Sequence, residues 1–172
     1  MGKSGLELYT EVFDRCFAEF PKFNVKPFSS SWWGRLMKAT IWRGAAGITF
    51  WNTIIVDDDL IGTEKGAELL SHEVVHVRDQ HRWLILFPLS YFLLLPVGPS
   101  LKAVWEWRAY KETLRWVHEH PNDSWNQEYR NYIDDYYCQW VASQFVSPMY
   151  FWMWPFKSAM YKKAKDFVAS LP

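Results

Sequence analysis

The segment 68–83, ELLSHEVVHVRDQHRW, constrains the fold more than any other part of this 172-residue chain. Thr63 suits an N-cap and Glu64 falls in the first turn, so the sequence predicts a helix that begins there and runs through the segment. Residues four apart in a helix are separated by about 400° of rotation, so His72 and His76 project from nearly the same face. The helix therefore presents two imidazoles to one point, where a single metal ion would bind both.

The residue after the first histidine, Glu73, completes an HExxH arrangement. Its carboxylate is offset from the two imidazoles, so it can reach a metal-bound water without binding the metal. Zinc lowers the pKa of a bound water, and the carboxylate then takes the proton and passes it to a leaving amine. The pattern predicts Zn²⁺ held by His72 and His76, with Glu73 as general base and acid.

A third histidine, His81, lies nine residues after His72. That spacing corresponds to about 900° of helix, which places His81 on the opposite side. We therefore expect it at the surface or next to a ligand rather than on the metal. A third ligand has to come from another element.

The predicted helix 101–118 offers that ligand. A catalytic zinc site needs a third protein ligand and an open position for water. Glu106 supplies a carboxylate, and the small Ala109 on the same face would let this helix approach the motif helix closely. Glu112 is the rival ligand, but it stands on a different face. Glu106 is therefore the favoured metal ligand.

These residues together resemble a known family. HEVVH at 72–76 followed by EWRA at 106–109 is similar to the HExxH and ExxA motifs of the gluzincin metallopeptidases, in particular the small minigluzincins and related membrane-linked peptidases. The resemblance covers about residues 47–118. It implies that the two histidines and the glutamate of EWRA are zinc ligands and that the glutamate of HEVVH is the general base and acid. It also implies that the upstream strand AGITFWNT pairs with an extended peptide substrate.

The oxyanion stabiliser is less constrained by the sequence. Related peptidases often carry an aspartate after the alanine of ExxA, where this chain has Tyr110. A phenol there would reach a zinc-binding histidine or the substrate oxyanion, which makes Tyr110 a candidate catalytic residue. Tyr132, Tyr136 and His118 are the alternatives.

The remaining pattern predicts a mostly helical α+β chain. Two β-rich runs, 39–43 and 47–56, flank a Gly-Ala-Ala-Gly turn and suggest a hairpin. Further helices are predicted over residues 4–20, from near Trp32, from 123 or 124 to about 146, and over 156–170. We expect one domain over residues 1–172, a compact minigluzincin-like helical domain with a small hairpin or short sheet before the HExxH helix.

Composition narrows the partners and the compartment. Lysine plus arginine equals aspartate plus glutamate at 19 each, so no basic field favours nucleic acid as a partner. The two cysteines, Cys16 and Cys138, lack any CxxC spacing and suit a reducing compartment. Composition therefore predicts a cytoplasmic protein, and the resemblance to the gluzincins implies that it acts on a peptide or protein substrate.

Two apolar segments add a candidate membrane contact. Residues 83–101 carry no charge, but three prolines and a glycine interrupt them. A helix that crossed a bilayer there would place His76 and Glu106 on opposite sides, which is incompatible with one shared ion. A hairpin that enters the membrane and returns on the same side is compatible both with the uncharged run and with one ion shared by His76 and Glu106. A hairpin buried in the protein core is compatible with both as well. Segment 83–101 is therefore predicted either to lie in the protein core or, together with the aromatic segment 149–156, to contact a membrane surface or a hydrophobic partner.

The sequence thus predicts a zinc-dependent metallopeptidase that hydrolyses peptide bonds with a zinc-activated water. The alternative from another class is a noncatalytic protein that is stabilised by zinc and binds a membrane or a partner. A third hypothesis is a metal-dependent hydrolase of another bond, such as an amide in a small molecule.

Overall fold

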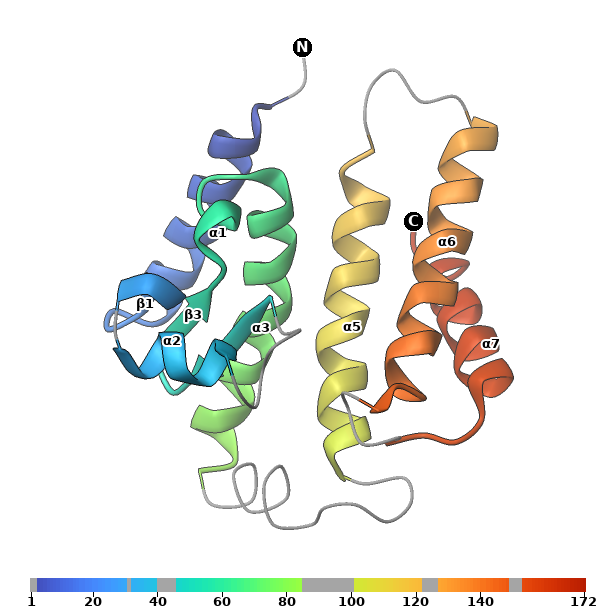
Figure 1. Cartoon of the computed structure of the whole chain (residues 1–172). Helices are drawn as coiled ribbons and strands as arrows, with labels where there is room; N and C mark the ends of the chain where they lie inside the picture. Colours follow the sequence, from blue (N-terminus) through green and yellow to red (C-terminus); the bar gives the residue numbers. More distant parts are fainter. Residues whose placement is uncertain (1–2, 31, 40–45, 85–100, 122–126, 149–152) are drawn as a thin grey trace. The chain divides into compact units, whose positions relative to one another are not determined.

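The computed structural model describes residues 3–30, 32–39, 46–84, 101–121, 127–148 and 153–172 (Figure 1). Within them the chain forms six α-helices and one three-stranded sheet, which confirms the predicted fold class, α+β and mostly α. The chain divides into two compact units, an amino-terminal unit Lys3–His81 and a carboxy-terminal unit that comprises Arg82–Pro172. The single domain over residues 1–172 stays a prediction.

The amino-terminal unit contains three helices and all three described strands. Its first helix is capped by Ser4, whose hydroxyl accepts a hydrogen bond from the Glu7 N–H at 3.3 Å, while the Glu7 carboxylate accepts one from the Ser4 N–H at 2.7 Å. Its elements are α1 Gly5–Glu19, β1 Asn24–Pro27, α2 Trp32–Ala39, β2 Gly47–Phe50, β3 Thr53–Val56 and α3 Glu64–Arg82. α1 and α3 were predicted to within about two residues, and α2 begins near Trp32 as predicted, whereas the end of α2 and the strand β1 were not predicted.

The sheet corrects the predicted hairpin. The strand order is β1-β3-β2, with β1 parallel and β2 antiparallel to β3. The segment 47–56 was predicted as one strand, but it turns at Trp51 and Asn52, so it supplies both β2 and β3. Trp51 has a φ of 52°, the left-handed conformation that a tight two-residue hairpin turn requires. The sequence concealed this turn because a bulky aromatic stands where glycine or asparagine is usual.

The other half of the predicted hairpin was also misplaced in part. Ala39, predicted to begin the first β-rich run, is the last residue of α2. Residues 40–45 lie outside the described residues, as do 85–100 of the apolar segment 83–101 and 149–152 of the segment 149–156.

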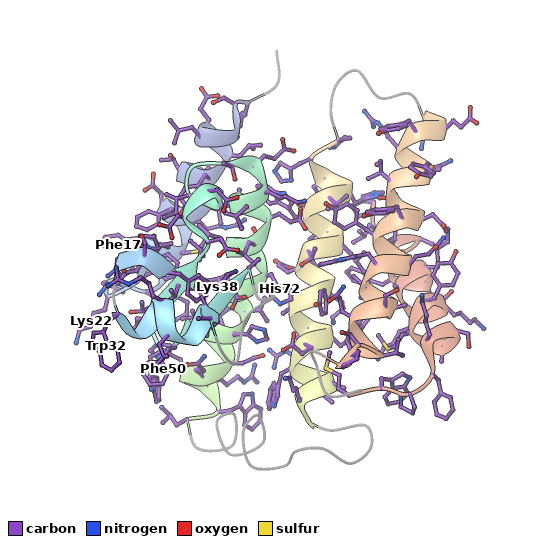
Figure 2. The ribbon with its side chains drawn as sticks, in the orientation of Figure 1. Phe17, Lys22, Trp32, Lys38, Phe50 and His72 are labelled. Atoms are coloured by element: carbon purple, nitrogen blue, oxygen red, sulfur yellow. The ribbon has the colours of Figure 1, made fainter. Side chains whose placement is uncertain are left out.

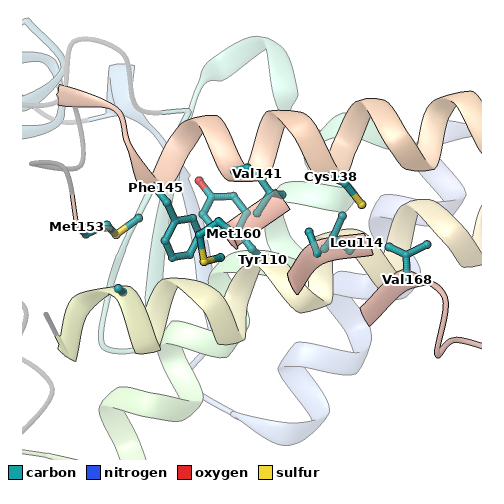
Figure 3. Packing of buried hydrophobic residues seen from close by; sticks show 11 residues of the cluster. Tyr110, Leu114, Cys138, Val141, Phe145, Met153, Met160 and Val168 are labelled. Carbon is teal, nitrogen blue, oxygen red and sulfur yellow. The ribbon is translucent and has the colours of Figure 1, made fainter. Parts of the chain in front are cut away.

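The carboxy-terminal unit consists of three helices, α5 Leu101–Glu119, α6 Gln127–Phe145 and α7 Lys157–Val168, which match the predicted helical ranges closely. Apolar side chains from all three form one cluster (Figure 3). Tyr110 and Leu114 come from α5, Phe145 from α6 and Met160 from α7, each no more than 3% exposed. Burial of such side chains is worth about 1.5–3 kcal/mol each, so this cluster accounts for much of the stability of the unit.

A polar contact ties α6 to α7 beside this cluster. Asp135 Oδ1 accepts hydrogen bonds from Tyr161 Oη at 2.6 Å and Lys165 Nζ at 2.8 Å, and Oδ2 accepts one from Gln139 Nε2 at 2.7 Å. These three hydrogen bonds lower the pKa of Asp135 to about 2, and the bond from Lys165 contributes most.

Aromatic residues make up 19% of the chain, and part of them lie at the surface. In the amino-terminal unit, Phe17, Trp32 and Phe50 are 49%, 60% and 66% exposed, and they project outward from this unit in Figure 2. Phe50 directly precedes the hairpin turn, so the end of the hairpin carries an exposed apolar side chain.

Candidate metal centre

α3 carries the two histidines of HEVVH in its buried part. The helix begins where Thr63 Oγ1 accepts a hydrogen bond from the Gly66 N–H at 3.0 Å, which is the predicted N-cap. His72 and His76 are buried, and their ring centroids lie 5.2 Å apart with the rings inclined by 74° (His72 is labelled in Figure 2). The spacing of four residues therefore brings both imidazoles to one face of the helix, as expected.

Glu106 of α5 completes a group of three buried candidate ligands. Its side chain is 1% exposed. One ligand atom from each of His72, His76 and Glu106 lies within 4.8 Å of the other two, so these residues could hold a metal ion. Glu112, the rival ligand, is not part of this group and forms an ion pair with Arg115 one turn along α5.

The chemistry of the three donors fits a metal site. Two imidazole nitrogens and one carboxylate oxygen suit zinc and other first-row transition metals. All three side chains are buried, with exposed fractions of 8%, 5% and 1% for His72, His76 and Glu106. Three protein ligands also leave a coordination position for water, whereas a structural zinc site is normally closed by four. The group therefore fits a metal ion, and zinc is among the metals that it suits.

Lys102 adds a buried positive charge one turn before Glu106. It lies on α5 with the i,i+4 spacing that places both side chains on one face. Burial lowers the pKa of Lys102, and the charge of Glu106 acts in the opposite direction. Sequence reasoning did not select Lys102, although its spacing from Glu106 was a usable signal.

Glu73 lies beneath the edge strand β2. Thr49 Oγ1 donates a hydrogen bond to Glu73 Oε2 at 2.5 Å, and the same hydroxyl lies 3.3 Å from the Glu73 carbonyl oxygen. At Gly47, a Cβ atom would lie only 3.2 Å from Glu73 Oε1 and 3.1 Å from the Leu69 side chain. Glycine therefore lets the β2 backbone pass close to the carboxylate, and Thr49 fixes its orientation.

Gln80 connects the same face of α3 to the hairpin turn. Its Oε1 accepts a hydrogen bond from the Trp51 N–H at 2.5 Å, and its Nε2 donates one to the Thr49 carbonyl at 3.3 Å. Gln80 follows Glu73 by seven residues, two helical turns, so both side chains lie on the side of α3 that faces β2. Neither Thr49 nor Gln80 was selected from the sequence, because their partners are 24 to 31 residues away.

The remaining predicted site residues lie in different surroundings. His81 is exposed, and its Nε2 lies 2.6 Å from Asn52 Oδ1 while its ring stacks on Phe20 at 5.0 Å. Tyr110 is 2% exposed, and its ring packs against Phe145 in the apolar cluster (Figure 3) and against the partly exposed Trp140. The catalytic role of Tyr110 stays a prediction.

The alternative oxyanion candidates are all on the carboxy-terminal unit. Tyr132 and Tyr136 are 62% and 53% exposed on α6. His118 Nδ1 lies 3.1 Å from Asp134 Oδ2, and its Nε2 lies 3.4 Å from the Pro172 carbonyl. His118 is therefore engaged by α6 and by residue 172 within its own unit.

Comparison with known proteins adds no family assignment. No family model, no curated protein and no solved structure matches this chain. Among the helices of the described residues, none combines the length and the apolar character that crossing a bilayer requires. The function has to be argued from the geometry of the residues themselves.

Proposed function

We propose that the protein is a zinc-dependent metallopeptidase of the gluzincin type. The observation that carries this proposal is the buried group formed by His72, His76 and Glu106, which could hold a metal ion. In this reading the three residues bind zinc, and Glu73, which is adjacent in sequence to the first ligand, is the general base and acid.

The chemistry assigns distinct tasks to the side chains around Glu73. When bound, zinc would lower the pKa of a coordinated water and polarise the scissile carbonyl. Glu73 takes the proton of the water as its oxygen attacks the carbonyl carbon, and returns that proton to the amine nitrogen as the C–N bond breaks. The hydrogen bond from Thr49 engages Oε2 and holds the carboxylate in one orientation, so Oε1 is the oxygen suited to carry the proton.

The edge of β2 supports a peptide as the substrate. The Asp57 N–H donates to the Ala46 carbonyl at 3.0 Å, so Ala46 and Asp57 form a hydrogen-bonded pair. Because such pairs alternate along antiparallel strands, the backbone groups of Gly47 and Thr49 point away from β3, toward the edge. An extended peptide can pair with groups of this kind, and here they lie beside Glu73.

The decisive experiment replaces the base and keeps the ligands. The Glu73→Gln protein, loaded with zinc, should retain its metal by elemental analysis and cleave a quenched peptide library at least about a hundredfold more slowly than wild type. Glu112→Gln is the matched control, because it makes the same change at a carboxylate outside the group of candidate ligands, and it should keep wild-type turnover. Equal activity in the Glu73 variant, or no cleavage by zinc-loaded wild type, would refute the proposal.

The noncatalytic alternative makes a different prediction for the coordination. A structural zinc site would be closed by a fourth protein ligand, so zinc-loaded protein would show no exchangeable water in X-ray absorption or Co²⁺-substituted optical spectra. The described residues supply three ligands, which favours the catalytic arrangement. A four-ligand spectrum combined with no hydrolysis would favour the alternative.

A further inference from the structure

The edge of β2 is not uniform along its length. Thr49 directs its carbonyl toward the edge, and the Trp51 N–H follows two residues later, the spacing at which a partner strand would pair with both. Gln80 already occupies these two groups, with Nε2 on the Thr49 carbonyl and Oε1 on the Trp51 N–H. Its side-chain amide thus takes the place of the N–H and the C=O that a neighbouring strand would present to these two groups.

The edge groups that stay available lie on the other side of Glu73. Among the described residues, no hydrogen bond engages the Thr49 N–H or the N–H and carbonyl of Gly47. Gly47 also brings the backbone within contact of Glu73 Oε1. A peptide can therefore pair with the edge at Gly47 and Thr49, beside the general base, but it meets Gln80 if it continues toward the hairpin turn.

The direction of the peptide decides which end is restricted. Antiparallel pairing is slightly more stable per residue than parallel pairing, so the favoured peptide runs opposite to β2. Its amino-terminal side then points toward Trp51 and Gln80, and its carboxy-terminal side points toward Ala46. The blocked end of the edge is the end that would receive residues before the scissile bond.

We propose that Gln80 is a specificity-determining residue, which closes the β2 edge at Thr49 and Trp51 and restricts the substrate to a short amino-terminal flank before the scissile bond. This inference rests on the proposed peptidase function and deepens it, because it names the substrate as an extended peptide cleaved near its amino terminus. Gln80 acts on the backbone of the hairpin and takes no part in proton transfer.

The test compares peptides that differ only in the length of that flank. Zinc-loaded wild type, Gln80→Ala and Gln127→Ala are given a series with one to six residues before the same scissile bond. Gln127 is the matched control because it is an exposed glutamine on α6 whose side chain donates to Asn131. Wild type and the control should lose kcat/KM as the flank lengthens. Gln80→Ala should recover kcat/KM for the longest peptides by about tenfold, because the Thr49 carbonyl and the Trp51 N–H become available to the peptide.

A readout independent of turnover checks the hairpin itself. Hydrogen exchange of the Trp51 amide should be faster in Gln80→Ala than in wild type while the amides of β3 keep their protection, which shows that the fold is intact. Gln80→Glu serves as a second variant, because it keeps an acceptor for the Trp51 N–H but cannot donate to the Thr49 carbonyl. It should show an intermediate flank preference.

The outcomes separate this inference from the function on which it rests. If Glu73→Gln abolishes cleavage but Gln80→Ala keeps the wild-type flank preference, the peptidase assignment stands and the role of Gln80 is overturned. If zinc-loaded wild type cleaves no peptide of any flank length, the peptidase assignment fails and the inference fails with it. A wild type that prefers long amino-terminal flanks also overturns the inference.

Discussion

The helices α3 and α6 both span 19 residues, but only α3 buries polar and charged side chains. The buried residues of α6 are Cys138, Val141, Ala142 and Phe145, all apolar. α3 buries several apolar side chains too, together with six polar or charged ones, Ser71, His72, Glu73, His76, Asp79 and Gln80.

This difference has an energetic meaning. A buried polar group costs free energy unless it is hydrogen-bonded, and a buried charge costs more. The buried face of α6 follows the rule for stability, since it fills the apolar cluster of its unit. α3 departs from that rule over residues 71–80, and such departures are expected where a site performs chemistry. The two helices therefore predict opposite responses to mutation, loss of function from α3 and loss of stability from α6.

The largest expected effect comes from removing a candidate ligand on α3. His76→Leu should lower the affinity for zinc by on the order of a thousandfold. The binding free energy of zinc in protein sites is roughly 10–16 kcal/mol, and the variant would lose one of three protein ligands. Stability without metal should change by no more than about 1 kcal/mol, since leucine is apolar and fills a similar volume. Competition with a chromogenic chelator measures the affinity, and denaturant unfolding in the presence of a chelator measures the stability.

His81→Leu is the control on the same helix. Its ring is exposed and bonded to Asn52, so zinc affinity should stay at the wild-type value. If both substitutions weakened zinc binding equally, the assignment of ligands by helical rotation would be wrong.

The second-largest expected effect is a loss of stability from a substitution in α6. Phe145→Ala should lower the free energy of unfolding by about 3–5 kcal/mol, because the side chain is 1% exposed within the apolar cluster and its removal leaves a cavity. Chemical denaturation monitored by circular dichroism measures the change. Tyr132→Ala on the exposed face of the same helix should cost no more than about 0.5 kcal/mol. Similar losses at both positions would contradict the cluster as the source of stability.

The smallest effect concerns the polar contact between α6 and α7. Asp135→Asn should destabilise the protein by about 1 kcal/mol at pH 7, a value discounted because the Asp135 side chain is 31% exposed. The pKa of Asp135 is lowered to about 2 from an ordinary 3.8, so its contribution is present above the unfolded-state value and is lost as the pH falls through the folded-state value. The difference in unfolding free energy between wild type and variant should therefore shrink between about pH 4 and pH 2. A difference that persists unchanged to pH 2 would show that the ionised carboxylate is not its source.

The candidate site was predictable wherever the relevant geometry is local. The pairing of His72 with His76 follows from rotation per residue, and so does the exclusion of His81 from their face. Glu106 was selected over Glu112 because the small Ala109 shares its face of the helix, and the group of buried candidate ligands contains Glu106. The helices were found because apolar periodicity and caps are also local signals.

The sheet was predictable only in outline. A short β-element before α3 was expected, but β1 was missed because its partner β3 is nearly thirty residues later in the chain, and Asn24 pairs with Thr53. The turn at Trp51 was missed because its left-handed backbone is imposed by strand pairing rather than preferred by tryptophan.

By itself, the sequence determined the helices and the order of the candidate metal ligands, because a helix is specified by contacts within four residues along the chain. Tertiary structure alone decided where the hairpin turns, which edge of β2 is available, and that Thr49 and Gln80 meet the motif helix. These contacts join residues 24 to 31 positions apart, and their formation depends on how the whole unit packs. Short-range patterns carry no information about such pairings, so the environment of Glu73 came from the fold.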